Sequence, residues 1–386
     1  MKGEIDDILR RAVDAGDVPG VVAVIVDAEG VRYEGAAGER AARSGRAMTV
    51  DTVGAIQSMT KAVTGVAAMR LVEQGYLDLD APADRVCREL ADVEVLVGFD
   101  ADGRPVTRPR AAEITLRNLL THTSGFAYEF WNADLLRYLE VTGAPRLAAR
   151  SVAALIQPLT SDPGTRWEYG IGIDWAGQMI ERVTGERLGD HVAEHIFAPL
   201  VMTDTAYRPR PTMVERAASL HLRQGDGSLV VVPSPPPPDD AIDLGGGGLH
   251  GTMPDYARFL RMILNGGELD GRRVLAADTV DDMTRNHIGD LRVQPMPSTN
   301  PVLSEDAEFF PGTPKSWGLT WQIDEQAQET GRPAGTLMWA GLHNSFFWID
   351  RRNDLAGCFL TQLLPFVDHR AVATFHAVES AAYAAH

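Results

Sequence analysis

The chain has 386 residues, of which 45% are hydrophobic and 23% charged, and this is the composition of an ordinary soluble globular enzyme. Its formal net charge of −17 argues against nucleic acid as the main partner. No apolar run reaches the roughly 18 to 20 residues that a membrane-spanning helix needs, so we expect no membrane partner.

The N-terminus has the pattern of a charged amphipathic helix over about the first 20 residues, without the apolar core of a secretory signal. We therefore expect a cytoplasmic location. The only cysteines are Cys87 and Cys358, which cannot build a thiolate metal site. We expect no metal and no cofactor.

A hairpin is predicted after this helix. Two strand-like runs, Val21–Asp27 and Val31–Gly38, are joined by the short turn Ala28–Gly30.

The next feature is a serine and a lysine three residues apart, Ser58 and Lys61, which lie on one face of a helix. The helix continues through the periodic apolar residues of Ala62–Gly75 and stops at the glycine. Only 3 of the 36 basic residues are lysines, and lysine, unlike arginine, can give up its proton. Ser58 is therefore a candidate nucleophile and Lys61 a candidate base. The tetrapeptide alone leaves open that Ser58 merely caps the helix.

The middle of the chain, from about residue 80 to residue 240, is mainly helical with long loops. Its clearer apolar-periodic segments are Leu116–Leu120, Ser151–Leu155 and Gly172–Val183. Ser234–Pro238 predicts a stiff exposed loop. Gly245–Gly248 predicts a tight backbone crossing, since the run lacks the lysine and the spacing of a phosphate loop.

Strands return near the C-terminus after a helix over Pro254–Leu264, and a last helix ends the chain. The predicted strands are Trp317–Asp324, Thr336–Ala340, Ser345–Asp350 and Leu355–Leu364, and the last helix covers about Asp368–Ala385. This order predicts an α+β fold in which residues 1–55 and 245–386 form one lobe around a sheet. Residues 56–244 then form a mainly helical lobe that carries the Ser58 helix and the Tyr169 loop.

Several segments, in order and over nearly the whole length, carry a family resemblance: Ile56–Lys61, Leu116–Gly125, Pro163–Gly170, Pro199–Thr205, Gly245–Asp255 and Trp339–Asp350. On these segments the chain resembles the serine β-lactamase/penicillin-binding protein superfamily, and within it the family VIII carboxylesterases, which are similar to class C β-lactamases. The resemblance implies an antiparallel sheet flanked by helices plus an all-helical lobe, with the nucleophile in the cleft between them.

The resemblance also implies the chemistry. Ser58 is then the acylated nucleophile, and Lys61 and Tyr169 form a coupled basic pair that takes its proton. We expect the Lys61 charge to favour a phenolate on Tyr169, which acts as general base and later protonates the leaving alcohol. The expected oxyanion donors are the backbone N–H groups of Ser58 and Leu342.

Two departures from the family pattern bear on substrate choice. Trp339 stands where β-lactamases of the family carry a lysine that holds the substrate carboxylate, and Ile171 replaces an asparagine. Both changes favour neutral, more apolar esters over anionic β-lactams. The expected substrate contacts are Trp339, Gly341, Ile171 and Tyr128.

Other aromatic residues and the remaining lysine are ambiguous. Phe130, Trp131, Phe309 and Phe310 are as consistent with packing as with lining the pocket. Lys315 precedes the wrong strand to replace the missing lysine, and we expect it to be a surface charge.

Two other types of hydrolase are less well supported by the sequence. His191–His195 fits the H-x-x-E-H pattern of inverted zinc peptidases, but solvated polar residues on a helix explain it better. The chain has no G-x-S-x-G nucleophile elbow, so an α/β-hydrolase origin of esterase activity is not supported.

The sequence thus predicts a serine carboxylesterase that hydrolyses small or medium neutral esters through an acyl-enzyme on Ser58. The alternatives are an acyltransferase that passes the acyl group to an alcohol or amine, a weak β-lactamase or D-aminopeptidase, and a sensor that acylates without turnover. The expected partner is a small-molecule ester, and the sequence does not indicate an oligomeric state.

Overall fold

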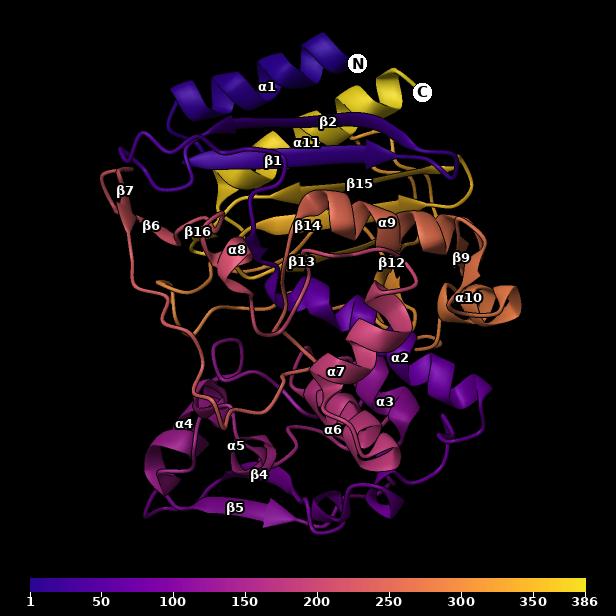
Figure 1. The fold of residues 1–386 in the computed structure, drawn as a ribbon. Coiled ribbons are helices and arrows are strands. Elements are labelled where there is room, and N and C mark those ends of the chain that lie inside the picture. Colours follow the sequence, from indigo (N-terminus) through magenta and orange to yellow (C-terminus); the bar gives the residue numbers. More distant parts are fainter.

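A seven-stranded antiparallel sheet is the centre of the structure, a computed structural model that describes residues 1–386. Its strand order is β11-β12-β13-β14-β15-β1-β2, so strands from both ends of the chain meet inside one sheet (Figure 1). The strands are β1 Gly20–Val26, β2 Val31–Gly38, β11 Lys315–Trp317, β12 Gln322–Asp324, β13 Leu337–Gly341, β14 Ser345–Asp350 and β15 Leu355–Leu360.

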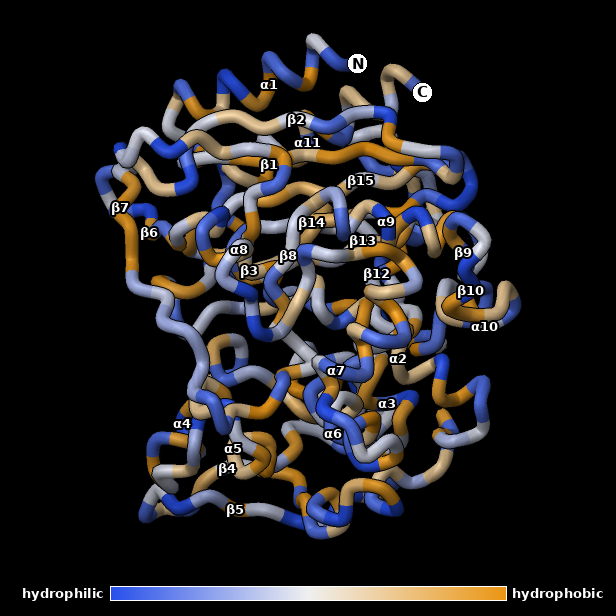
Figure 2. The backbone as a smooth tube through the Cα atoms, viewed as in Figure 1, coloured by the Kyte–Doolittle hydropathy of each residue, from blue (hydrophilic) through white to orange (hydrophobic).

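Helices cover both faces of this sheet. Helices α1 (Lys2–Asp14) and α11 (His369–Ala384) pack against each other on one face, and α9 (Met253–Leu264) packs on β1, β14 and β15 from the other (Figure 1). All seven residues of β1 are buried, because helices cover both faces of the sheet at this strand. The strand is accordingly apolar throughout. Figure 2 shows β1 as a largely hydrophobic strand.

The second lobe contains most of the other helices, below the sheet in Figure 1. They are α2 Thr60–Glu73, α3 Leu116–Leu120, α4 Ala133–Thr142, α5 Val152–Leu155, α6 Gly172–Thr184 and α7 Leu188–Val192, which a π-helical turn, Ala193–Phe197, continues. Helix α2 stops before Gly75, whose φ of +75° needs a glycine. The two lobes and the antiparallel sheet confirm the predicted fold class.

The remaining elements are short. They are α8 Pro211–Val214, α10 Ala277–Met283, β3 Gly54–Ala55, β4 Val95–Phe99, β5 Pro105–Arg108, β6 His221–Arg223, β7 Leu229–Val231, β8 His250–Gly251, β9 Glu268–Leu269, β10 Arg272–Arg273 and β16 Leu363–Leu364. Strand β6 pairs with β16, so part of the middle segment returns to a strand from the C-terminal end. The residue bounds predicted for the two lobes stay a prediction.

The prediction of one strand over Trp317–Asp324 is wrong. The chain reverses between Trp317 and Gln322, so that Lys315 pairs with Asp324 in an antiparallel hairpin of β11 and β12. Thr320 has a φ of +88°, which belongs to a turn. Apolar residues at every second position, Trp317, Leu319, Trp321 and Ile323, continue through the turn and imitate one strand.

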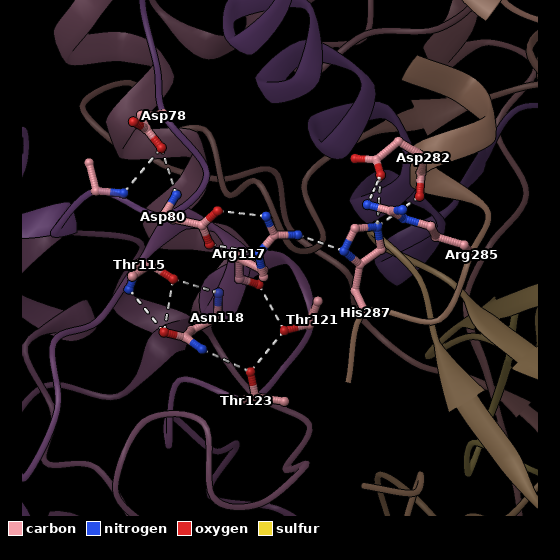
Figure 3. A network of polar contacts seen from close by, with 11 residues as sticks. Asp78, Asp80, Thr115, Arg117, Asn118, Thr121, Thr123, Asp282, Arg285 and His287 are labelled. Carbon is pink, nitrogen blue, oxygen red and sulfur yellow. Dashed lines mark hydrogen bonds and ion pairs between the residues drawn. The ribbon is translucent and has the colours of Figure 1, made fainter. Parts of the chain in front are cut away.

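A polar network connects the short helix α3 with two other segments of the chain, one around Asp80 and one around His287 (Figure 3). Thr115 and Asn118 form a reciprocal capping box at its start. Arg117 makes a two-point contact with Asp80, with both N···O distances 2.7 Å, and donates to His287 Nδ1 at 2.6 Å. The network therefore ties the α2–α3 connection to the segment that precedes β11.

The structure has no helix that combines the length and the apolar character needed to cross a membrane.

The C-terminal lobe contains a charged cluster without solvent contact. The Arg332 guanidinium forms ion pairs with Asp324, at 3.3 Å, and with Glu379, and all three side chains are 0% exposed. Removing the single cation leaves two buried carboxylates without a counter-charge, which is costly.

Replacement of Arg332 by methionine is expected to lower the free energy of unfolding by about 3–5 kcal/mol. The matched control is Arg104→Met, because Arg104 forms a salt bridge with Asp102 but has a side chain that is 77% exposed. The control change is expected to stay within about 0.5 kcal/mol. Urea unfolding of both variants measures the difference, and equal stabilities would contradict this account of the cluster.

Candidate active site

Ser58 lies in a tight turn, Gln57–Met59, that leads directly into α2. The residue before it, Gln57, has a φ of +48°, an uncommon value for a residue with a side chain. Strained backbone of this kind concentrates at functional sites. The Gln362 side chain holds the approach to the turn, since it accepts from Ala55 N–H at 3.0 Å and donates to Ala55 O at 3.1 Å.

Lys61 follows one helical turn later, and its amine is completely buried. Nζ donates to Ser58 Oγ at 3.0 Å, to Tyr128 Oη at 3.0 Å and to the Gly246 carbonyl at 2.7 Å. Burial lowers the pKa of Lys61 to about 7, although the nearby Asp174 carboxylate acts in the opposite direction. A substantial fraction of this amine is therefore neutral at neutral pH.

Tyr169 reaches the same serine from the loop before α6. Its hydroxyl accepts a hydrogen bond from Trp339 Nε1 at 2.8 Å and has Ser58 as a second partner. The Lys61 amine lies 4.7 Å from the centre of the Tyr169 ring. The structure thus brings Ser58, Lys61 and Tyr169 together from two segments of the chain.

The expected resting phenolate on Tyr169 does not agree with its surroundings. Burial raises the pKa of Tyr169, and the hydrogen bonds from Ser58 and Trp339 only partly offset this effect. Because the pKa of Lys61 is lowered at the same time, the pair favours a neutral amine beside a neutral phenol.

The segment Thr121–Gly125 holds the Tyr169 loop in place. The His122 carbonyl accepts from the Glu168 N–H at 2.8 Å, and the Thr123 carbonyl accepts from Gly164 N–H at 2.7 Å. The His122 ring packs 4.6 Å from that of Tyr169. Burial holds the pKa of His122 well below its usual value, so this histidine is a neutral packing partner.

Lys61 is buried behind Ser58, and Ser58 and Tyr169 line a cavity of about 300 Å³. Most of its wall is apolar, and it is lined by Gln57, Ser58, Tyr128, Glu129, Phe130, Trp131, Leu147, Ala148, Arg150, Tyr169, Asp174, Leu244, Gly246, Gly247, Leu303, Trp339, Ala340, Leu342 and Phe366. Buried pockets of this kind, with a few convergent polar groups, are typical of small-molecule sites.

The expected substrate contacts divide into two groups. Tyr128 and Trp339 line the cavity, whereas Gly341 and Ile171 do not. Ile171 is 0% exposed and is part of the hydrophobic core. A side chain on Gly341 would meet the Ile56 carbonyl at 2.3 Å, so this glycine lets β13 lie against the Ser58 turn. Substrate contact at Gly341 and Ile171 is therefore not supported.

The two backbone N–H groups predicted to bind an oxyanion lie where β13 packs against the Ser58 turn. Ser58 and Leu342 both line the cavity. The Leu342 amide follows the end of β13 and makes no hydrogen bond to the rest of the chain. It is therefore free to bind an oxygen atom of a ligand.

The expectation that Lys315 is a surface charge is wrong. Its side chain is 2% exposed, and Nζ donates to Glu308 Oε1 at 3.0 Å and to the Phe310 carbonyl at 3.1 Å. Pairing with these two oxygens lets the charge lie inside the lobe. Phe130 and Trp131 line the cavity, whereas Phe309 and Phe310 do not.

The histidine pair of the H-x-x-E-H pattern gains a neighbour that the sequence did not suggest. His191 Nδ1 lies 2.8 Å from Glu186 Oε2, and possible ligand atoms of Glu186, His191 and His195 all lie within 4.8 Å of one another. The hydrogen bond with Glu186 satisfies one ring nitrogen of the buried His191. The absence of a metal stays a prediction.

Sequence reasoning missed two members of the site. Tyr128, expected only as a substrate contact, is the first, because its hydroxyl is a direct partner of Lys61. Asp174 is the second, and a carboxylate between the apolar residues Ile173 and Trp175 was a usable signal.

Comparisons with known proteins agree with this geometry. The β-lactamase family model matches residues 5–381. A lovastatin esterase of Penicillium rubens is 33% identical, over 94% of this chain and 94% of its own length. A monacolin J acid methylbutanoyltransferase of Aspergillus terreus is 32% identical, over 94% of this chain and 91% of its own length.

Solved structures give the same result. A mutant form of simvastatin synthase (LovD) from Aspergillus terreus superposes with a TM-score of 0.85 at 31% identity, over 99% of this chain and 96% of that one. EstCE1, a hydrolase with promiscuous acyltransferase activity, shares the fold with a TM-score of 0.77 at 21% identity. The predicted superfamily is confirmed, while the narrower likeness to family VIII carboxylesterases stays a prediction. The chain belongs to the β-lactamase family and is an enzyme of the serine hydrolase and acyltransferase type.

Proposed function

We propose that this enzyme transfers an acyl group from an ester to an alcohol or amine through a covalent intermediate on Ser58. The observation that carries the proposal is the set of contacts at one oxygen atom. Ser58 Oγ lies 3.0 Å from a buried amine, has the Tyr169 hydroxyl as a partner and faces an apolar cavity. A serine hydroxyl becomes an effective nucleophile when an adjacent base can take its proton.

In the first half-reaction, neutral Lys61 accepts the Ser58 proton while Oγ forms a bond to the carbonyl carbon of the ester. The resulting oxyanion would lie between the backbone N–H groups of Ser58 and Leu342. When the tetrahedral intermediate collapses, the bond to the leaving alcohol breaks. Tyr169 gives that oxygen a proton and is reprotonated by Lys61, so the pair returns to its starting charge.

In the second half-reaction an acceptor replaces the leaving alcohol. The Lys61–Tyr169 pair removes its proton as the acceptor oxygen or nitrogen attacks the acyl carbon. The bond to Ser58 Oγ then breaks, and Oγ recovers the proton from the pair. With water as the acceptor, the same steps give hydrolysis.

The transferase is preferred over the carboxylesterase for two reasons. Aromatic and aliphatic side chains form most of the cavity wall, which favours an organic acceptor over water. Relatives at 32% identity are named as methylbutanoyltransferases.

The esterase that hydrolyses small or medium neutral esters stays the second candidate. Support for it comes from the relative named as a lovastatin esterase, at 33% identity. Trp339 offers no charge to the carboxylate of a β-lactam, so weak β-lactamase or D-aminopeptidase activity is the least supported alternative.

The variants Ser58→Ala, Lys61→Ala and Tyr169→Phe are each expected to lower turnover of p-nitrophenyl butyrate at least about a thousandfold, because the three groups act as a unit. Intact-protein mass spectrometry should find an acyl adduct on the native enzyme and none on Ser58→Ala. Circular dichroism checks that each variant is folded. A near-normal rate for folded Tyr169→Phe would rule out its part in proton transfer.

The pH dependence follows from the buried amine. Burial lowers the pKa of Lys61 to about 7, and only the neutral form accepts a proton. Below this pKa, kcat/KM is therefore expected to fall about tenfold per pH unit, with a plateau above it. Initial rates from about pH 5 to pH 9 measure the profile. A rate that is constant through this range, with the protein folded throughout, would show that this group does not limit the reaction.

Adding an alcohol separates transfer from hydrolysis. For a transferase, rising concentrations of a branched or cyclic alcohol should divert the acyl group from the free acid to the new ester, with a saturable dependence. Chromatography of both products at a fixed donor concentration measures the partition. Free acid as the sole product with every acceptor would favour the esterase.

A further inference from the structure

We infer that Asp174 is a positioning residue that supplies the counter-charge of Lys61 and so decides how readily this amine exchanges the Ser58 proton. The catalytic consequence rests on the proposed function, whereas the electrostatic relation between the two residues does not. Neither the family match nor the named relatives assign a role to this carboxylate.

A single peptide unit connects the acid with the amine. Asp174 lies in the first turn of α6 and is 2% exposed. Its Oδ1 accepts a hydrogen bond from the Gly246 N–H at 2.8 Å, and the Gly246 carbonyl accepts one from Lys61 Nζ at 2.7 Å. The acid and the amine thus bond the N–H and the carbonyl of the same residue, Gly246.

The other oxygen of the carboxylate faces Tyr128. A methyl group on Gly246 would lie 2.7 Å from Asp174 Oδ2 and 2.9 Å from Tyr128 Oη, so both atoms border the same small space. Tyr128 Oη is also 3.0 Å from Lys61 Nζ. Oδ2 is buried, and the Tyr128 hydroxyl is the side-chain group that lies beside it and bonds the carboxylate. This arrangement brings a carboxylate, a phenol and an amine together around one glycine.

The groups that surround Lys61 leave Asp174 as its counter-charge. The titratable groups near the Lys61–Asp174 pair are His122, Tyr128, Glu129, Arg150, Tyr169 and Tyr207. Burial keeps the histidine and the three tyrosines neutral. The Glu129 carboxylate raises the pKa of Tyr128. Arg150 is a second cation, and it lowers the pKa of Asp174. Asp174 raises the pKa of Lys61 against the effect of burial, and Lys61 in turn opposes the burial that raises the pKa of Asp174.

The position of Asp174 is also consistent with a role in the α6 terminus alone, since acidic side chains stabilise the first turn of a helix. The two roles differ in the quantity that they change. A helix-terminal role affects the stability of α6, whereas a counter-charge sets the pKa of Lys61. Asparagine preserves the shape and removes the charge, so the Lys61 titration in this variant separates the two roles.

Lysine NMR tests the inference directly, because the chain has only three lysines. Labelling with ¹³C,¹⁵N-lysine gives three side-chain signals, and Lys2→Arg and Lys61→Arg assign them. In the native protein the Lys61 signal should titrate near pH 7. In Asp174→Asn its pKa should fall by about one to three, the usual effect of losing an adjacent opposite charge. Asp174→Glu retains the charge and should restore most of the native value.

The matched control is Asp255→Asn, which neutralises another buried carboxylate, one that bonds Asp204 and Thr205 instead of the Lys61 cluster. Its Lys61 titration should equal that of the native protein. A second test is Gly246→Ala, whose methyl group pushes the Asp174 carboxylate away while the charge stays in the chain. The Lys61 pKa should fall here as well.

An unchanged Lys61 titration in folded Asp174→Asn overturns the inference. Unfolding of both Asp174→Asn and Gly246→Ala, with Asp255→Asn folded, also overturns it, because Asp174 would then be a folding residue. The acid limb of kcat/KM should move to lower pH in Asp174→Asn, together with the NMR titration. If the native enzyme transfers no acyl group, the proposed function fails while the NMR result still decides the role of Asp174.

Discussion

The burial of the Lys61 amine is the constraint on which the site depends. An ammonium group taken out of water loses several kcal/mol of hydration, and only compensating contacts or loss of the proton can restore the balance. The structure uses both solutions. Three oxygen atoms accept hydrogen bonds from Nζ, and burial still lowers the pKa of the amine to about 7. The same desolvation that makes Lys61 expensive to bury therefore makes it a usable base.

This constraint explains the glycine run. Side chains on Gly245 and Gly248 would meet the Ile173 carbonyl at 2.5 Å and the Tyr207 ring at 2.4 Å. Only glycines let this segment pass between α2 and α6 closely enough to offer the Gly246 carbonyl to Lys61 and its N–H to Asp174. The run is a packing device that brings backbone groups to the amine.

Local sequence patterns predicted much of the fold, because apolar periodicity and turn residues define many of its helices and strands. The β1–β2 hairpin and helix α3 match their predicted ranges within a residue, since apolar periodicity and turn residues define them. The split of β11 and β12 does not follow from the pattern, because the alternation of apolar residues continues through the turn at Leu319 and Trp321. The burial of Lys315 and the partnership of Asp174 with Lys61 depend on residues far apart in the sequence, which no local pattern contains.

Trp339, at the position where the family resemblance leads us to expect a lysine, agrees with the same electrostatic argument. The indole Nε1–H donates to the Tyr169 hydroxyl at 2.8 Å, so the site keeps a hydrogen-bond donor at this oxygen without a second cation. A second ammonium here would oppose the charge of Lys61 and would need its own counter-charge in a cavity with apolar walls. With a neutral donor instead, Asp174 alone balances Lys61, and the remaining wall is free to pack against neutral parts of a donor and an acceptor. The fate of an acyl-enzyme in such a cavity then depends on whether an organic acceptor or water occupies the space beside Ser58.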